Sequence, residues 1–338
     1  MSKYKQQRSA KFTLAGLLAT TILAFAPNLW AGGDVVHWWV GDAESKALKM
    51  IVDEFESSGG KWVDTPHNDS EAAHASVKSR VIGGKPPAAV LMVVGATSQE
   101  WAKGGMLNDV DSVAKAENWD TVLPDGVASA SKQDGKYIAA PVFISTVNWR
   151  YASLSVLQSA GVDEPMSWGA FMTSLPRIQK AGYIPIAMGG QDWQETLLFD
   201  HVALGAGGAQ YFRELLDGNM DTIDSDDTTR VFAAMRALAP YTDAGKAGRS
   251  WGDTNNLVIS GKAAYFFMGD WAKGGFLQAK KNPGKDFSCE ISPGSGMVLT
   301  AVDGFAFPKT SSSSDQSTQG SLASAMMNKD VQTKAALI

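Results

Sequence analysis

Tryptophan side chains stand beside acidic or amide side chains at several points of this 338-residue sequence, which contains eleven tryptophans. A flat indole gives contact area to the apolar face of a ligand, and carboxylates and amides form hydrogen bonds around its edge. A pyranose ring has an apolar face and a polar rim, so this combination would suit a sugar. The candidate ligand-binding residues of this kind are Trp38, Trp39, Glu44, Gln191, Trp193, Trp251, Asp270 and Trp271.

Burial in a core is the competing explanation for any tryptophan. Core and site roles are equally open for four that lie in or beside expected helices, away from strand ends: Trp62, Trp101, Trp119 and Trp168. Neighbouring residues of a strand point to opposite faces, so one of Trp38 and Trp39 can be a core residue, and the sequence does not say which. We expect a structural role for His37, which precedes them.

Motifs for metal, phosphate or covalent chemistry are absent from the sequence. The four histidines include no pair four residues apart around a glutamate, and no glycine-rich loop ends in Gly-Lys-Ser or Gly-Lys-Thr. A Gly-x-Ser-x-Gly elbow is also absent. We therefore expect neither a metal nor a cofactor. Two of the 35 acidic residues could still form the carboxylate pair of a glycoside hydrolase, because sequence alone does not place them.

The composition is that of a water-soluble globular protein, with 44% hydrophobic residues, 19% charged residues and a net charge of −5. Nucleic-acid binding needs clustered Lys and Arg, and an acidic chain without a basic stripe does not provide them. The single Cys289 excludes a disulfide framework within the chain. At about 150 residues per domain, the length predicts two domains.

Residues 1–31 have the pattern of a secretory signal peptide. The segment begins with four basic and no acidic side chains, and an apolar run follows that is shorter than the about 20 residues of a membrane anchor. A small residue, Ala31, ends it. Cleavage after Ala31 would change the net charge from −5 to −9. No cysteine follows the run to carry a lipid, so we expect a soluble protein in the periplasm.

Strand-like and helix-like segments alternate along the rest of the chain, which predicts an α/β fold with largely parallel strands. Strands are expected at 34–39, 61–65, 88–94, 184–190, 262–269 and 297–307. Most candidate tryptophans fall at the carboxyl ends of these strands, the edge at which open α/β sheets bind ligands. The serine-rich segment 311–320 is expected to be a solvated loop.

The chain ends on an apolar Ala-Ala-Leu-Ile without a cap or polar tail. An open apolar end is unusual for a terminus, and an unpaired cysteine is unusual in an exported protein. We therefore expect that the chain is a fragment and that a C-terminal helical region is missing.

Several segments together resemble the sugar-binding subunits of ABC importers, the family 1 extracellular solute-binding proteins. They follow in the same order over nearly all of the chain after residue 31, and the glucose/mannose-type periplasmic binding proteins are the most similar subgroup. The segments include VVHWWVGDAESKAL, DGKYIAAPV, VNWRY, AGYIPIAMGGQDWQETLLFDHVAL, AGRSWGDTNNLVISGKAAYFFMGDWAKGGF and VDGFAF. The resemblance implies two α/β lobes joined by crossing hinge segments. It places the N-terminal lobe at 32–145 and 303–338, and the C-terminal lobe at 146–302.

The resemblance also assigns residues. The stacking tryptophan pair of the family falls on Trp38-Trp39, its strand-following Asp-Trp on Asp270-Trp271, and its hinge-region aspartate on Asp303, while its Gln-x-Trp loop matches 191–193. The chain departs from the glucose binders at Val93-Val94, Ile144–Thr146 and Met188, where polar groups are exchanged for apolar or smaller ones. Glucose itself is therefore not assigned, and a related monosaccharide, a deoxysugar or a glycoside is equally open.

These inferences predict a periplasmic sugar-binding subunit of an ABC importer that performs no chemistry. Its expected partners are a small sugar and the permease membrane subunits, without nucleic acid, and its expected state is a monomer. Two alternatives remain. One is a secreted carbohydrate-active hydrolase that uses two cleft carboxylates, and the other is an importer subunit whose aromatic cage binds an amine or amino acid.

Overall fold

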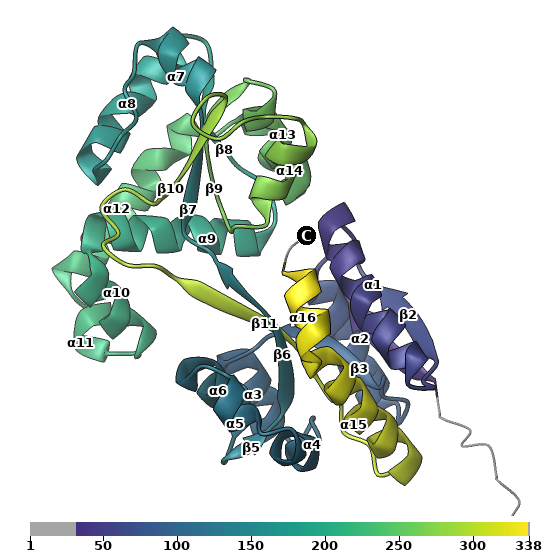
Figure 1. Ribbon diagram of the computed structural model, residues 1–338. Coiled ribbons are helices and arrows are strands. Elements are labelled where there is room, and N and C mark those ends of the chain that lie inside the picture. Colours follow the sequence, from purple (N-terminus) through teal and green to yellow (C-terminus); the bar gives the residue numbers. More distant parts are fainter. Residues whose placement is uncertain (1–31, 337–338) are drawn as a thin grey trace, which may run out of the picture.

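The computed structural model describes residues 32–336, without the side chains of residues 42 and 43. The expected signal peptide, residues 1–31, lies outside this range. The chain forms two bodies, each with its own sheet and flanking helices, and long strands connect them (Figure 1). The fold is therefore the expected two-lobed α/β architecture with crossing hinge segments.

The first body, here called the N-lobe, is built on a sheet with the strand order β2-β1-β3-β11-β6. Strands β1, β2 and β3 run parallel, whereas β11 is antiparallel to both β3 and β6. Its strands are β1 (Gly33–His37), β2 (Trp62–Pro66), β3 (Ala89–Val93), β6 (Ala139–Thr146) and β11 (Thr300–Ala306), with the hairpin β4 (Lys132–Gln133) and β5 (Lys136–Tyr137). Its helices are α1 (Asp42–Ser57), α2 (Ser70–Ile82), α3 (Ala96–Lys103), α4 (Asp111–Ala116), α5 (Trp119–Val122), α6 (Asp125–Ala130), α15 (Ser313–Met327) and α16 (Lys329–Ala335).

The second body, the C-lobe, has a sheet with the order β10-β7-β9-β8, in which β8 and β9 are parallel and β7 is antiparallel to β9 and β10. Its strands are β7 (Trp149–Ser153), β8 (Ile184–Ala187), β9 (Ala263–Met268) and β10 (Phe287–Ile291). Its helices are α7 (Leu154–Ala160), α8 (Trp168–Lys180), α9 (Asp192–Val202), α10 (Ala209–Leu216), α11 (Met220–Ile223), α12 (Asp226–Leu238), α13 (Trp251–Ile259) and α14 (Ala272–Gln278). A π-helical turn, Ala203–Gly207, follows α9, and 3-10 turns lie at Ala239–Tyr241 and Ala244–Lys246.

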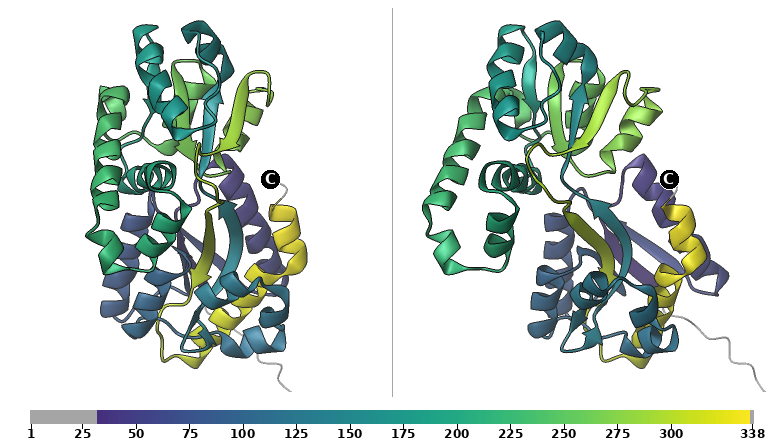
Figure 2. Two further views of the ribbon diagram at one scale, coloured as in Figure 1. Left: turned by 90° about the vertical axis from the view of Figure 1, so that its left-hand side faces the viewer. Right: turned by 60° about the vertical axis from the view of Figure 1, so that its left-hand side comes forward.

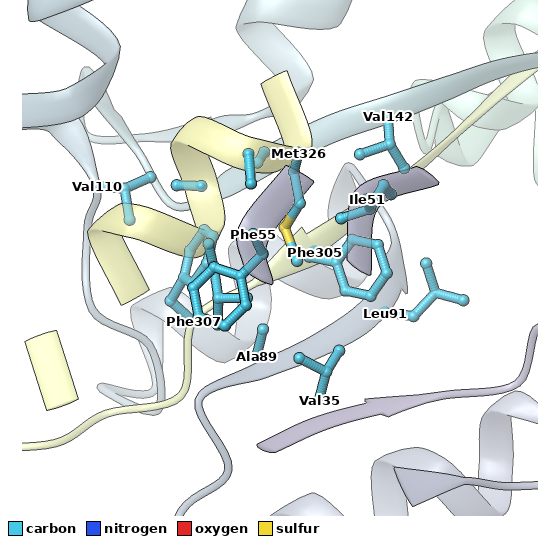
Figure 3. Close-up of a cluster of buried hydrophobic side chains, with 14 of the residues drawn as sticks. Val35, Ile51, Phe55, Ala89, Leu91, Val110, Val142, Phe305, Phe307 and Met326 are labelled. Carbon is cyan, nitrogen blue, oxygen red and sulfur yellow. The ribbon is translucent and has the colours of Figure 1, made fainter. Parts of the chain in front are cut away.

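The N-lobe sheet is buried on both faces, which explains why its central strand, β3, is apolar throughout. On one face, α1, α15 and α16 cover a cluster that includes Phe55, Phe305 and Met326, all without exposed surface (Figure 3). On the other face, α2 and α3 cover a second cluster. The alternation of β1 sends Val35 into the first cluster and Val36 into the second. The sheet is therefore held rigidly from both sides.

The serine-rich segment 311–320 is not a solvated loop, so that prediction was wrong. Helix α15 begins at Ser313, and the side chain of Ser312 caps it by accepting a hydrogen bond from the backbone N–H of Asp315 at 3.3 Å. Gln319 is 2% exposed, donates to the carbonyl of Pro308 at 2.7 Å and accepts from the Asn108 amide at 2.8 Å. Capping and a satisfied buried amide outweigh the modest helix propensity of serine.

Two chain segments, 146–149 and 297–300, cross between the lobes side by side, and Asn148 joins them (Figure 2). Its fully buried side-chain amide donates to the carbonyl of Met297 and accepts from the N–H of Leu299, both at 2.9 Å. The backbone N–H of Val147 also donates to the carbonyl of Leu299 at 3.0 Å. Asn148 therefore fixes the register of the two segments.

Substitution of Asn148 by alanine is expected to lower the free energy of unfolding by about 1–3 kcal/mol, because two partly buried backbone groups lose their partners. Urea unfolding followed by circular dichroism measures this. The matched control is Asn256→Ala at an exposed position of α13, where we expect a change within about 0.5 kcal/mol. Equal effects of the two substitutions would contradict the role of Asn148.

Candidate functional site

The carboxyl ends of the parallel N-lobe strands lie at the edge of the sheet nearest the hinge. Asp303, in the middle of β11, pairs with Val93, the last residue of β3. Strand β1 runs parallel to β3 and ends at the same edge, where Trp38 and Trp39 follow it. This edge faces the C-lobe (Figure 2).

The C-lobe sheet presents its own strand ends to the same region. Met268, the last residue of β9, pairs with Trp149, the first residue of β7 after the hinge. Asp270 and Trp271 follow β9 after Gly269. Strand β8 runs parallel to β9, so the loop that carries Gln191 begins at the same edge. We call these facing residues the interlobe edge. Its members are Trp38, Trp39, Gly41, Glu44, Val93 and Asp303 from the N-lobe, and Gln191, Trp193, Trp251, Asp270 and Trp271 from the C-lobe.

Three carboxyl groups lie at the interlobe edge, and the charges of Glu44 and Asp270 act on Asp303. Burial raises the pKa of Asp303 to about 7, and the charges of Glu44 and Asp270 add to the shift, while a hydrogen bond from the Trp39 side chain opposes it. Burial also raises the pKa of Glu44, although this side chain accepts a hydrogen bond from the backbone N–H of Gly41 at 3.0 Å. Among residues 32–336, no basic side chain forms an ion pair with any of the three. The edge therefore has carboxyl oxygens that lack a cationic partner.

Asp270 is also part of the hinge. Burial raises its pKa, yet its carboxylate accepts a hydrogen bond from the backbone N–H of Thr146 at 2.9 Å. Its own backbone N–H donates to the carbonyl of Thr146 at 2.9 Å. This double contact attaches the end of β9 to the end of β6, and no local sequence signal indicates it, because the two residues lie 124 positions apart.

The C-lobe contributes a group of three half-buried indoles, Trp193, Trp251 and Trp271, that pack on the same core cluster. The rings of Trp193 and Trp271 lie 6.4 Å apart between centroids, at 53°. The indole of Trp251 reaches the N-lobe, since its Cζ2 atom lies 3.9 Å from the position that a Cβ would take on Gly41. Aromatic surface of one lobe thus meets Gly41, the N-cap of the helix that carries Glu44, in the other.

Further hydrogen bonds fix the loop that carries Gln191 and the loop that precedes Trp251. Gln194, 2% exposed, donates to the side-chain oxygen of Gln191 at 2.9 Å. The guanidinium of Arg249 binds both carboxylate oxygens of Asp243 at 2.6 Å and the carbonyl of Met188 at 3.0 Å. The loop before Trp251 is thereby tied to the loop that carries Gln191.

Of the two adjacent tryptophans, Trp39 is the core residue. It is 4% exposed and meets Phe143 and Phe305 edge-on, with centroids 5.4 and 5.9 Å away. Trp38 remains half-buried at the sheet edge. His37 is 2% exposed and hydrogen-bonds Asp64 at 2.9 Å, which is a structural role.

The remaining tryptophans serve mainly as packing groups. Trp101 and Trp119 are buried, and Trp62 and Trp168 pack partly buried against core clusters. In the part of the chain that the structure describes, no group of three or more His, Cys, Asp or Glu side chains is placed to hold a metal ion. None of the helices in residues 32–336 combines the length and apolar character that crossing a membrane requires.

The family model of the bacterial extracellular solute-binding proteins matches residues 41–325. The chain belongs to this family. A "probable sugar-binding periplasmic protein" of Brucella suis biovar 1 is 39% identical to this solute-binding protein over 281 residues, which is 82% of this chain and 66% of that protein. A protein of the same description from Rhizobium meliloti is 38% identical over 298 residues, 87% of this chain and 71% of that one. The solute-binding protein thus spans about two thirds of the length of these curated relatives.

Solved structures share the fold of this solute-binding protein. The bacterial solute receptor AcbH, described as having an exclusive preference for β-D-galactopyranose, superposes with a TM-score of 0.71 at 22% identity, covering 89% of this chain and 77% of that one. At this identity the likeness concerns the fold alone, and it agrees with the two-lobed architecture.

Replacing Asp303 with asparagine is expected to stabilise the ligand-free protein at pH 8 by about 1–3 kcal/mol and to change little at pH 4. A folded-state pKa of about 7, against an ordinary value of 3.8, means that ionisation costs free energy in the folded state. The neutral Asp303 side chain therefore contributes its full share to the stability of the unmodified protein below pH 3.8, and this contribution is lost as the pH rises through 7. Chemical unfolding at both pH values measures the difference. Asp217→Asn, at an exposed position after α10, controls for the loss of one charge, and an equal gain there would contradict the prediction.

Gly269→Ala is expected to displace the Trp271 indole, because a Cβ at residue 269 would lie 2.0 Å from its ring. The shift should appear as a changed emission spectrum of the protein and a changed near-ultraviolet circular dichroism signal. Gly274→Ala is the matched control, since a Cβ there meets nothing within 4 Å. Identical spectra of the two variants would show that Trp271 is not held by this contact.

Proposed function

We propose that this solute-binding protein binds a small sugar between its lobes, performs no chemistry on it, and delivers it to the permease membrane subunits of an ABC importer. The observation that carries the proposal is the interlobe edge itself. Three indoles of the C-lobe lie across from N-lobe carboxyl groups without cationic partners, and Trp251 and Gly41 meet between them. Such surfaces match the apolar face and the hydroxyl groups of a sugar.

The relatives support the same class of ligand. The Brucella suis and Rhizobium meliloti proteins are described as probable sugar-binding periplasmic proteins, and the receptor AcbH as a β-D-galactopyranose binder. Their periplasmic descriptions, with the signal-peptide pattern of residues 1–31, support export to the periplasm. We propose a monomer that functions through lobe closure around the ligand.

Roles for the individual residues follow from their positions. We assign ring stacking to Trp38, Trp193, Trp251 and Trp271, which are half-buried and keep accessible surface. Hydrogen bonds to ligand hydroxyls are assigned to Glu44, Gln191, Asp270 and Asp303. Trp39 is almost entirely covered, so we assign it the orientation of Asp303 through the hydrogen bond between their side chains.

Two exposed valines near Asp303, Val93 and Val40, here called the Val93 rim, favour a sugar with an apolar edge. Val93 lies directly across the ladder from Asp303 and is 50% exposed, and Val40, after Trp39, is 53% exposed. Residues paired across antiparallel strands present their side chains on the same face. A hydroxyl placed against Val93 would lose its hydrogen bonds, so a deoxysugar or a glycoside fits this rim better than a fully hydroxylated ring.

The hydrolase alternative has weaker support. A retaining or inverting enzyme needs one carboxyl to donate a proton and a second to act as nucleophile or base. The carboxylate of Asp270 is engaged by the Thr146 backbone in the hinge. The family to which the chain belongs consists of solute-binding proteins.

Titration with D-galactose, D-fucose, D-glucose, D-mannose, L-rhamnose and D-xylose tests the proposal by calorimetry and intrinsic fluorescence. At least one sugar should bind and change indole emission, and the deoxysugar D-fucose should bind better than D-galactose if the Val93 rim sets the preference. Trp271→Phe should weaken binding by about 2- to 10-fold, the value of an aromatic contact, whereas Trp62→Phe, at the far end of β2, should not.

Absence of binding to every sugar would refute the proposed function. Release of products from labelled oligosaccharides would instead establish the hydrolase.

A further inference from the structure

A row of rings leads from the surface of the N-lobe to Trp38. The imidazole of His74, on α2, meets the indole of Trp38 edge-on, with centroids 5.5 Å apart at 80°. On its other side, His74 meets Trp101 of α3, 5.3 Å away at 64°. The ammonium of Lys78 lies 5.2 Å from the ring centre of Trp101 and closes the row at the surface. His74 is therefore the middle ring between a buried indole and an indole of the interlobe edge.

The backbone of the sheet fixes the orientation of this imidazole. Nε2 of His74 lies 3.3 Å from the carbonyl oxygen of Leu91 in β3. A carbonyl only accepts, so Nε2 carries the proton and donates. Burial lowers the pKa of His74, which keeps the ring neutral at pH 7. Leu91 itself is fully buried in the centre of the sheet, so the hydrogen bond ties the ring to a rigid part of the lobe.

Trp38 needs such an external constraint. It lies after the last residue of β1, beyond the ladder that orders the strand. It packs partly buried against both N-lobe core clusters, so it stands where the two faces of the sheet meet at the edge. Because a side chain in this position has fewer neighbours than a core residue, each ring contact restricts its conformational freedom more strongly.

We propose that His74 is a positioning residue that holds the Trp38 indole in the orientation used for ligand stacking, by transmitting the fixed geometry of the β3 backbone through its ring. The ligand part of this inference rests on the proposed function. The structural part, that His74 controls the environment of Trp38, does not.

The structural part is tested on the ligand-free protein by fluorine NMR after labelling with 5-fluorotryptophan. Trp38→Phe identifies the Trp38 resonance by its disappearance. His74→Ala should shift or broaden that resonance, and His74→Phe, which keeps a ring between the two indoles but has no donor for the Leu91 carbonyl, should restore it only in part. The control Ser79→Ala, at an exposed position of the same helix, should leave it in place. An unmoved Trp38 resonance in a folded His74→Ala protein would overturn the proposal.

The ligand part is tested by calorimetric titration with the six sugars named above. His74→Ala should weaken the affinity for a bound sugar by about 2- to 10-fold, the range of one aromatic pair, and His74→Phe should recover only part of the loss because it keeps the ring contact but not the hydrogen bond to Leu91. In a Trp38→Phe background the same substitution should have a much smaller effect. An equal loss in both backgrounds would overturn the proposal, because His74 would then act without Trp38. If the unmodified protein binds none of the sugars, the proposed function fails, while the NMR result still decides whether His74 holds Trp38.

Discussion

The polarity of the strands at the hinge determines where every candidate site residue lies. Strand β6 leaves the N-lobe at its carboxyl end, and β7 enters the C-lobe at its amino end. In the N-lobe, β1, β3 and β6 run antiparallel to β11, so their carboxyl ends lie at the crossing point. In the C-lobe, β8 and β9 run antiparallel to β7, so their carboxyl ends lie there too. Loops at carboxyl ends can vary without disturbing the sheet, and here the two sets face each other. The site is a consequence of this direction of crossing.

The carboxyl groups at the interlobe edge lower the stability of the folded, ligand-free protein. Glu44, Asp270 and Asp303 gather at an edge where burial disfavours their charged forms. A protein selected only for stability would pair or remove such groups, and residues retained at a cost in stability are typical of functional sites. A ligand that donates hydrogen bonds would supply the missing partners. The tight contacts of Arg249 with Asp243 and of Asn148 across the hinge keep this arrangement in place.

Much of the fold follows from the sequence because its signals are local. The apolar strands β1, β3 and β9 and the hairpin turn at Asp134-Gly135, with φ values of 51° and 77°, are encoded by adjacent residues. The start of α15 was missed because a run of serines resembles a polar loop in composition, while its cap and the buried Gln319 depend on residues elsewhere in the chain. The choice between Trp38 and Trp39 depends on Phe143 and Phe305, which β6 and β11 bring together. The candidate site was predictable as a set of strand ends, but its hinge contacts and the ring of His74 were not.

Strand β11 also has a consequence for how the chain folds. It lies between β3 and β6, about 160 to 210 residues earlier in the sequence, and its Phe305 enters the core that α1 and α15 share. The N-lobe sheet cannot be completed until the entire C-lobe has been synthesised, whereas the C-lobe strands, residues 149–291, form an uninterrupted stretch. The lobe that begins first is thus the one that finishes last, and until β11 arrives, β3 and β6 each expose an apolar edge to other chains. The N-lobe therefore stays incomplete for as long as the C-lobe takes to be synthesised.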